Sequence, residues 1–464
     1  MNKPLCVVSC PIDTFSGYGA RSRDFVKGLI QSKGEEWDIK IMPQKWGDCP
    51  WNFLSQDDPL RQHFIIQLQQ QPDIWIQITV PNEFQPVGQF NIGVTAGIET
   101  TIFPGEFLEG FNRMNLNLVS SEHSKQVALI SQFDKKEQDK VIGNLKCEKP
   151  VEVLFEGLDL NKYYKKPQNS GLLKNIKEDF CFLYTGHWLP GILGEDRKNT
   201  GLMIKTFLET FKGLGKKKPA LILKTNQINY SLLDREEILK KINKIRKQIP
   251  GILPNIYLLH GEMTDDEMNQ LNNDNKVKAF VSFTKGEGYG RPLAEAAITG
   301  KPLITTNWSG HTDFLHPDYN ILIGGELKKV HKSAANNWLL KDSEWFNINT
   351  DVASRAMKDV FKHYKHYFSK SRKQTQYLKD NWSFDKMAEK INSLMPKVEM
   401  APQTQQVQLP KLKKIGNQKE DEREINYGDP STPALQKINV DGKENNMNWR
   451  GTDIKLPNLK KLKI

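Results

Sequence analysis

A glycine-rich loop between two short apolar segments constrains the fold of this 464-residue chain more than any other feature. Residues 277–283 are mostly apolar, and residues 286–290 read Gly-Glu-Gly-Tyr-Gly. A short helix is predicted over 292–299, since a proline at a helix start costs little, and residues 301–305 predict a second strand. Strand, loop, helix and strand make a βαβ unit. The loop therefore lies at the carboxyl end of a strand, against a helix N-terminus, where backbone N–H groups can hold an anion.

Two glutamates flank this anion site, Glu287 in the loop and Glu295 in the helix, with seven residues between them. A carboxylate does not help to bind phosphate, but it accepts hydrogen bonds from hydroxyls such as those of a sugar or a ribose. Glutamates are common in helices, so the spacing alone is also compatible with a loop glutamate and a solvated helix glutamate.

The segment resembles the E-x7-E signature of retaining nucleotide-sugar glycosyltransferases with the GT-B fold, in particular glycosyltransferase family 4. Residues 300–304 and 309–310 are similar to the family's G-x-P-V-I and G-G segments. The resemblance implies that Glu287 contacts hydroxyls of the donor sugar and that Glu295 binds the ribose. It also implies that the diphosphate meets the backbone of Gly288, Tyr289 and Gly290.

Strand-like and helix-like segments alternate along both halves of the chain, which is typical of parallel sheets wound with helices. Strands are predicted at 6–9, 74–80, 92–95, 116–120, 152–155, 180–184, 220–224, 256–259, 279–283 and 303–305, and helices at 20–30 and 201–211. The resemblance then implies an α/β protein of the GT-B class, with two Rossmann-like doubly wound domains facing a central cleft. The predicted parts are an acceptor domain over 1–165, a donor domain over 178–345, C-terminal helices over 346–396 that cross back to the first domain, and a disordered basic tail over 397–464.

The segment that follows the predicted strand at 180–184 contains three basic residues that fit a phosphate site, namely His187, Arg197 and Lys198. The family places a basic pair here, and Lys198 matches its lysine, while His187 stands where the arginine is usual. Arg197 is a candidate for the missing guanidinium. A cation at this place neutralises the leaving nucleotide diphosphate as charge develops. By itself the group also fits a solvated cluster at a helix start.

The first half is expected to hold the acceptor. Gly17 and Gly19, in a predicted turn over 16–19, face the same cleft in family members and approach the diphosphate or the sugar. Glu99 follows the predicted strand at 92–95, where many family members have a histidine or an acidic group, and it is a candidate for orienting or deprotonating the acceptor hydroxyl. A helix cap or loop glutamate is the alternative. His123 is a second candidate, with a solvated surface histidine as its alternative.

Cysteine and motif content set further bounds. Five cysteines without a C-x-x-C pair argue against a disulfide framework or a zinc site, and predict a reducing cytoplasm. No apolar run approaches the ~20 residues of a membrane span, so no transmembrane segment is predicted. The sequence has no D-x-D, the metal-binding motif usual in GT-A glycosyltransferases. We therefore expect no metal and no cofactor besides the nucleotide-sugar substrate.

The formal net charge is +11, and much of it is clustered. One cluster combines residues 216–218 with 240–247, and a second covers 362–373, where lysines and an arginine are interleaved with aromatic residues. Such clusters suit an anionic partner, namely nucleic acid, acidic lipid or an anionic glycan, although each also fits a solvated helix face. The tail repeats a Leu-Pro-x-Leu-Lys-Lys pattern at 409–415 and 456–462, which predicts a peptide that docks on a protein partner, although a soluble tail with chance similarity is the alternative.

The sequence thus predicts a retaining, metal-independent glycosyltransferase that moves a hexose or related sugar from a nucleotide-sugar to a hydroxyl of a glycan or lipid-linked glycan. Glu287, Lys198 and Glu99 are the candidate catalytic residues. The positive charge leaves modified DNA open as the acceptor. A non-catalytic scaffold that binds sugar nucleotides is the alternative from another class, since a fold alone does not fix a function.

Overall fold

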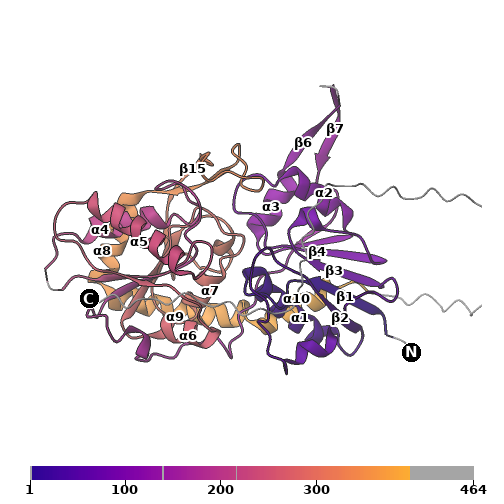
Figure 1. Cartoon of the computed structure of the whole chain (residues 1–464), viewed down its shortest axis with the longest axis horizontal. Helices are drawn as coiled ribbons and strands as arrows, with labels where there is room; N and C mark the ends of the chain where they lie inside the picture. The colour runs from indigo at the N-terminus through magenta and orange to yellow at the C-terminus, as the bar shows by residue number, and fades with distance from the viewer. Residues whose placement is uncertain (1–2, 138–139, 216, 398–464) are drawn as a thin grey trace, which may run out of the picture. The chain divides into compact units, whose positions relative to one another are not determined.

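A computed structural model describes residues 3–137, 140–215 and 217–397 of the chain (Figure 1). The predicted tail, apart from Lys397, lies outside these residues, and so do both Leu-Pro segments and Lys216 of the first basic cluster.

Each half of the described chain is built on a parallel six-stranded sheet. The first sheet has the order β2-β1-β3-β4-β5-β8 and the second has the order β11-β10-β9-β12-β13-β14. The first consists of β1 (Leu5–Cys10), β2 (Asp38–Pro43), β3 (Ile74–Ile78), β4 (Phe90–Val94), β5 (Leu116–Val119) and β8 (Val151–Val153). The second consists of β9 (Cys181–Thr185), β10 (Ala220–Lys224), β11 (Ile256–Leu259), β12 (Val277–Val281), β13 (Leu303–Thr306) and β14 (Ile321–Ile323).

Helices connect these strands and follow them. They are α1 (Gly17–Lys33), α2 (Gly105–Arg113), α3 (Glu122–Ile130), α4 (Thr200–Phe211), α5 (Leu232–Lys247), α6 (Asp265–Asn273), α7 (Arg291–Ala297), α8 (Thr350–Lys362), α9 (Tyr364–Asn381) and α10 (Phe384–Leu394). Short 3-10 helices lie at Pro59–His63, Pro81–Glu83, Gly171–Leu173 and Gly310–Asp313. Two antiparallel pairs complete the described chain: β6 (Gln132–Glu137) with β7 (Lys140–Lys146), and β15 (Gly325–Lys329) with β16 (Glu344–Ile348).

Both sheets are buried on both faces, because successive strand residues point to opposite sides. In β1, Val8 belongs to one apolar cluster and Val7 to another on the opposite face. In β9, Phe182 and Leu183 divide between two clusters in the same way. Each half therefore has its own two-layered core, which is the doubly wound arrangement that the alternation of elements predicts.

The last helices connect the two halves. α8 packs on α4 and α9 packs on α7, both in the second half, whereas α10 packs on α1 in the first (Figure 1). Gly28 of α1 lies at this contact, where an added Cβ would be 2.9 Å from Ile391 Cδ1. The chain returns to the first half next to Leu158, whose N–H donates to the carbonyl of Trp382 at 2.9 Å.

One expectation about local structure was wrong. Residues 16–19 do not form a turn before the helix, because Ser16 caps α1 and accepts a hydrogen bond from the N–H of Gly19 at 2.9 Å. The segment 161–177, which joins the two halves, is bound to α6 and the residue after it through its backbone N–H groups. Lys166 donates to Asn273 at 2.7 Å and Ser170 donates to Asp274 at 2.8 Å.

Candidate active site

The site predicted from the glycine-rich loop lies at the switch point of the second sheet. β9 has β10 on one side and β12 on the other, so the connections that leave these strands run in opposite directions. In such sheets ligands bind outside the carboxyl ends of the strands at this point. The loop after β9 carries Arg197 and Lys198, and the loop after β12 carries Glu287.

The glycines of the loop after β12 are required by its surroundings. Gly290 has φ +99 at the N-cap of α7, a conformation that favours glycine. A Cβ on Gly286 would lie 2.0 Å from the carbonyl oxygen of Glu99, and one on Gly288 would lie 2.0 Å from that of Ala96. The loop can therefore pack directly against the segment that follows β4 of the first half.

Backbone contacts fix the loop after β9 next to it. Asn199 adopts a left-handed conformation (φ 54) and caps α4, which ends the loop. The N–H of Lys285 donates to the carbonyl of Arg197 at 2.7 Å. The Arg197 guanidinium donates in turn to the carbonyl of Gly286 at 2.9 Å. The two loops thus hold each other at the carboxyl end of the sheet.

Four charged side chains, here called the Lys198 cluster, meet at this place: Glu99, Arg197, Lys198 and Glu287. Lys198 Nζ lies 2.6 Å from Glu287 Oε1 and 2.7 Å from Oε2. Arg197 Nη1 lies 3.6 Å from Glu287 Oε2 and 3.2 Å from Glu99 Oε1. The structure therefore brings together the three predicted catalytic residues and Arg197.

The cluster fixes the charge of Glu287. Burial by itself would raise the pKa of this carboxyl group, but the Lys198 and Arg197 charges outweigh it and lower the pKa to about 2. Glu287 is therefore a carboxylate at neutral pH and accepts hydrogen bonds only. Its own N–H is held by the hydroxyl of Ser309 at 2.9 Å.

Glu295 lies in a separate group, here called the Arg291 cluster, with Asp24, Glu156 and Arg291. Arg291 Nε is 2.9 Å from Glu295 Oε1, while Arg291 Nη1 is 2.6 Å from Asp24 Oδ2 and 3.7 Å from Glu156 Oε2. Burial raises the pKa of Glu295 to about 7, and Arg291 offsets only part of this effect. Asp24 and Glu156 belong to the first half, so this cluster also joins the two halves.

The remaining predicted donor residues lie around the loops. Gly17 and Gly19 form the first turn of α1, and the hydroxyl of Tyr18 between them accepts a hydrogen bond from the N–H of Ala96 at 3.1 Å, next to Gly288. Tyr289 is buried, and its hydroxyl has no hydrogen-bond partner in the described chain. His187 is exposed, and its carbonyl accepts a long hydrogen bond from Tyr184 at 3.4 Å.

His123 is not a solvated surface histidine. Its ring packs edge-on against Trp308 with 4.7 Å between centroids, and its Nε2 is buried with no partner among the described residues. Burial and the neighbouring His311 lower its pKa to about 4, so the imidazole is neutral at physiological pH. The side chain lies where α3 of the first half meets the second half.

Sequence reasoning missed the Arg291 cluster. Arg291 directly follows the glycine loop and begins α7, so its position suggests only a helix start. Asp24 lies 267 residues away on α1, in no motif, so nothing in the sequence pairs it with Arg291. The pairing of Arg291 with Asp24 and Glu156 depends on how the two halves of the chain meet, which the sequence does not show.

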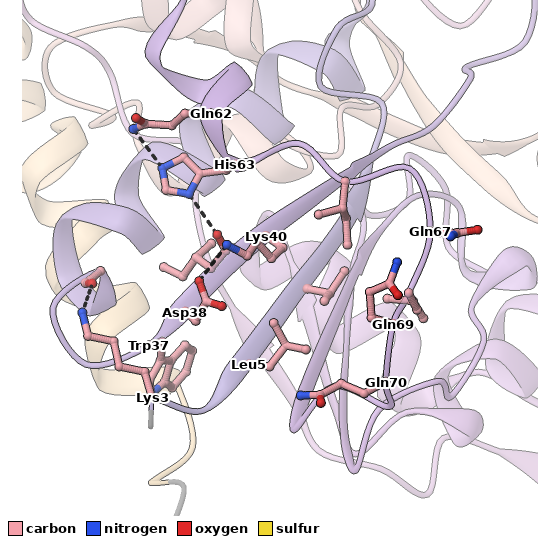
Figure 2. Close-up of a pocket in the computed structure, with 15 residues that line it drawn as sticks. Lys3, Leu5, Trp37, Asp38, Lys40, Gln62, His63, Gln67, Gln69 and Gln70 are labelled. Atoms are coloured by element: carbon pink, nitrogen blue, oxygen red, sulfur yellow. Dashed lines mark hydrogen bonds and ion pairs between the residues drawn. The ribbon is translucent and has the colours of Figure 1, made fainter. Parts of the chain in front are cut away.

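A hollow with a volume of about 950 Å³ lies in the first half, at the outer strand β2 (Figure 2). Trp37, Asp38 and Lys40 line it on one side, and Gln69 and Gln70 lie across from them. Asp38 is paired with Lys40 at 3.0 Å. None of the predicted site residues lines this hollow, and it gathers no second carboxylate, so it does not replace the Lys198 cluster as the candidate site.

The described residues contain no group of three or more histidine, cysteine or acidic side chains arranged to hold a metal ion. Within the same ranges, no helix combines the length and apolar character needed to cross a bilayer.

Comparison with solved structures identifies the architecture. The chain is similar to sucrose-phosphate synthase from Thermosynechococcus elongatus, with 10% identity over 85% of this chain and 98% of the other and a TM-score of 0.55. It is similar to Anabaena HepE, solved with UDP and glucose, with 11% identity over 84% and 98% and a TM-score of 0.53. It is also similar to a glycosyltransferase from Rickettsia africae, with 12% identity over 85% of this chain and 98% of the other and a TM-score of 0.52.

No family model matches the sequence, and no curated protein matches it. At these low identities the likeness concerns the fold, which is the two-domain GT-B fold.

Proposed function

We propose that the protein is a retaining glycosyltransferase that uses a nucleotide-sugar donor. The observation that carries this proposal is the Lys198 cluster at the switch point of the second sheet. Two cations and two carboxylates meet there beside the glycine loop, in a fold that is shared with a glycosyltransferase and a synthase. A non-catalytic scaffold that binds sugar nucleotides is the alternative, and turnover distinguishes the two.

In the proposed mechanism the donor diphosphate lies against Lys198, Arg197 and the N–H groups of the loop. The acceptor oxygen forms a bond to the anomeric carbon on the same face from which the diphosphate oxygen departs, which keeps the anomeric configuration. The bond to the diphosphate oxygen breaks, its electron pair leaves with the diphosphate, and the acceptor hydroxyl gives its proton to Glu99. In the structure Lys198 pairs with Glu287 and Arg197 pairs with Glu99. During the reaction the diphosphate takes over part of this pairing as its charge develops. Glu287, as a carboxylate, accepts hydrogen bonds from donor-sugar hydroxyls.

The acceptor is assigned to the first half. Glu99 comes from that half and lies next to Arg197, so we assign it the orientation of the acceptor hydroxyl. His123 is neutral, and its Nε2 has no hydrogen-bond partner among the described residues. This nitrogen is a second group that can accept the proton of the acceptor hydroxyl. A glycan or lipid-linked glycan is the proposed acceptor. Modified DNA is the other candidate, favoured by the exposed cations of α9.

The decisive experiment is a thermal-shift panel of UDP-, GDP- and ADP-sugars, followed by NMR of the product anomer. UDP-glucose comes first, because a HepE structure of the same fold holds it. A donor at about 100 times its dissociation constant should stabilise the protein by about 2.7 kcal/mol. The transferred sugar should keep its anomeric configuration.

An inverted product would contradict retention. Binding of a nucleotide-sugar without hydrolysis or transfer would favour the scaffold.

We further propose that the reaction needs no metal, so activity should survive EDTA. A loss of activity that magnesium or manganese restores would contradict this. The natural setting that we propose is the reducing cytoplasm, where all five cysteines remain free thiols.

A further inference from the structure

Helix α9 presents a row of cations that the proposed reaction does not use. Lys365, Arg372 and Lys379 are exposed and seven residues apart. Seven residues make nearly two turns, so the three side chains lie on one face at intervals of about 10 Å. The row spans about 20 Å, which is the axial rise of roughly six base pairs at 3.4 Å each.

Other cations widen this row. Lys370 and Lys373 are also exposed on α9. Lys165, from the segment after β8, lies 5.2 Å above the ring of Phe368. Its pKa is lowered, first by partial burial and then by the nearby Arg372 and Lys379 charges, so it lies beside the row. The α9 cationic face is defined here as Lys165, Lys365, Arg372, Lys373 and Lys379; Lys370 projects from another side of the helix.

The charge of this face is not neutralised within the described part of the chain. None of its five cations forms an ion pair with a described carboxylate. α9 itself carries one acidic residue, Asp380, which accepts a hydrogen bond from Gln376 at 2.8 Å. Helix α5 also carries many lysines, but it has three acidic residues, and its Lys240 is paired with Glu237 at 2.7 Å.

The apolar residues of α9 face inward. Leu378 is fully buried in the core of the second half, and no large apolar side chain of α9 is exposed. A helix that lies on a membrane needs an apolar face in the lipid, which α9 has already used in the core. A row of cations without exposed apolar groups instead suits a rigid polyanion with regularly spaced charges.

We propose that the α9 cationic face binds the phosphate backbone of double-stranded nucleic acid, without base specificity. Its side chains offer N–H donors and charge, and the amide of Gln376, which lies between Arg372 and Lys379, is already bonded to Asp380. We therefore assign them the positioning of the protein on the duplex rather than the selection of a sequence. This binding is separate from sugar transfer. It is measured without donor and holds whether or not nucleic acid is the acceptor.

The test uses the full chain and a fluorescein-labelled 20-base-pair DNA duplex, with anisotropy recorded between 50 and 200 mM NaCl. The variant Lys365→Glu/Arg372→Glu/Lys379→Glu reverses the row. The matched control, Lys240→Glu/Lys244→Glu/Lys247→Glu, reverses three exposed lysines on one face of α5 and changes the net charge equally.

The row variant should raise the dissociation constant at least about tenfold at 50 mM salt. It should also flatten the slope of log K against log salt by up to about 2.7, which corresponds to three phosphate contacts. The α5 variant should change the dissociation constant less than about threefold. The milder Lys365→Gln/Arg372→Gln/Lys379→Gln variant should give a smaller loss in the same direction, which guards against an unfolded charge-reversal variant.

Equal losses in the two charge-reversal variants would overturn the proposal, because net charge alone would then explain binding. No wild-type binding at 50 mM salt would overturn it as well. Binding to vesicles with 30% phosphatidylserine but not to the duplex would assign the face to a membrane instead. None of these outcomes bears on the thermal-shift panel, so this proposal and the proposed enzyme activity fail independently.

Discussion

The two glutamates of the E-x7-E segment are equally buried, yet their carboxyl groups differ in proton affinity. Each side chain is 10% exposed. The pKa of Glu287 is lowered to about 2, whereas that of Glu295 is raised to about 7. Glu287 has Lys198 on both oxygens and Arg197 at 3.6 Å. Glu295 pairs with Arg291 at 2.9 Å, and Arg291 is also paired with Asp24 at the shorter distance of 2.6 Å.

Sharing of cations, rather than burial, therefore decides which glutamate holds a proton. In the Lys198 cluster two cations serve Glu287 and Glu99. In the Arg291 cluster three carboxylates share Arg291, and the next cation, Arg21, lies 3.6 Å from Glu156. The glutamate assigned to the sugar is thus permanently charged, whereas the one assigned to the ribose titrates near neutral pH.

The largest effect is expected from removing the shared cation. Arg291→Met should lower the free energy of unfolding by about 3–5 kcal/mol, because it leaves buried carboxylates without a partner. Urea denaturation measures the loss, and Arg235→Met, at an exposed position of α5, is the control. A loss below about 1 kcal/mol would mean that Arg291 does not hold the three carboxylates.

Lys198→Ala should lower turnover about 100-fold or more while changing nucleotide affinity less, because its charge acts on the leaving diphosphate. Steady-state kinetics with the donor found in the panel measure this. Lys205→Ala is the matched control, since Lys205 lies on the adjoining helix α4 with a side chain that is 37% exposed. Normal turnover in Lys198→Ala would remove this lysine from the mechanism.

Nucleotide affinity should rise about tenfold between pH 6 and pH 8, because a carboxyl group with a pKa of about 7 goes from about 10% to about 90% ionised over this range. The ionised form accepts ribose hydroxyls more strongly. Calorimetric titration measures the profile. Glu295→Gln should remove the part of the rise that belongs to this residue, whereas Glu287→Gln should keep it. An unchanged profile in Glu295→Gln would reject the ribose assignment.

Much of the fold is readable from the sequence because parallel sheets are buried on both faces and produce continuous apolar segments. All ten predicted strands overlap strands of the two sheets. The strands that were missed are the edge strands β2 and β14 of the two sheets and the antiparallel pairs β6–β7 and β15–β16. β14 has only three residues, β6 and β7 are rich in lysine, and every residue of β15 is exposed, so none of these four strands gives a long apolar segment.

The site is readable only where its residues are close in sequence to a motif. Glu287 lies in the glycine loop, and Lys198 lies in a basic segment at a helix start, so both were expected. Their direct pairing, and that of Arg197 with Glu99 of the other half, depend on how the halves meet. Asp24 carries no signal at all, yet it shares Arg291 with Glu295.

The smallest effect tests that sharing directly. Asp24→Asn removes the carboxylate closest to Arg291, so Arg291 should interact more strongly with Glu295 and the pKa of Glu295 should fall. The midpoint of the affinity profile should then move down by about one pH unit, equivalent to about 1.4 kcal/mol. Asp38→Asn, which alters a half-exposed aspartate of β2 that is paired with Lys40, is the matched control and should leave the midpoint in place. An unmoved or rising midpoint in Asp24→Asn would show that burial alone, and not the division of one guanidinium among carboxylates, sets the protonation of Glu295.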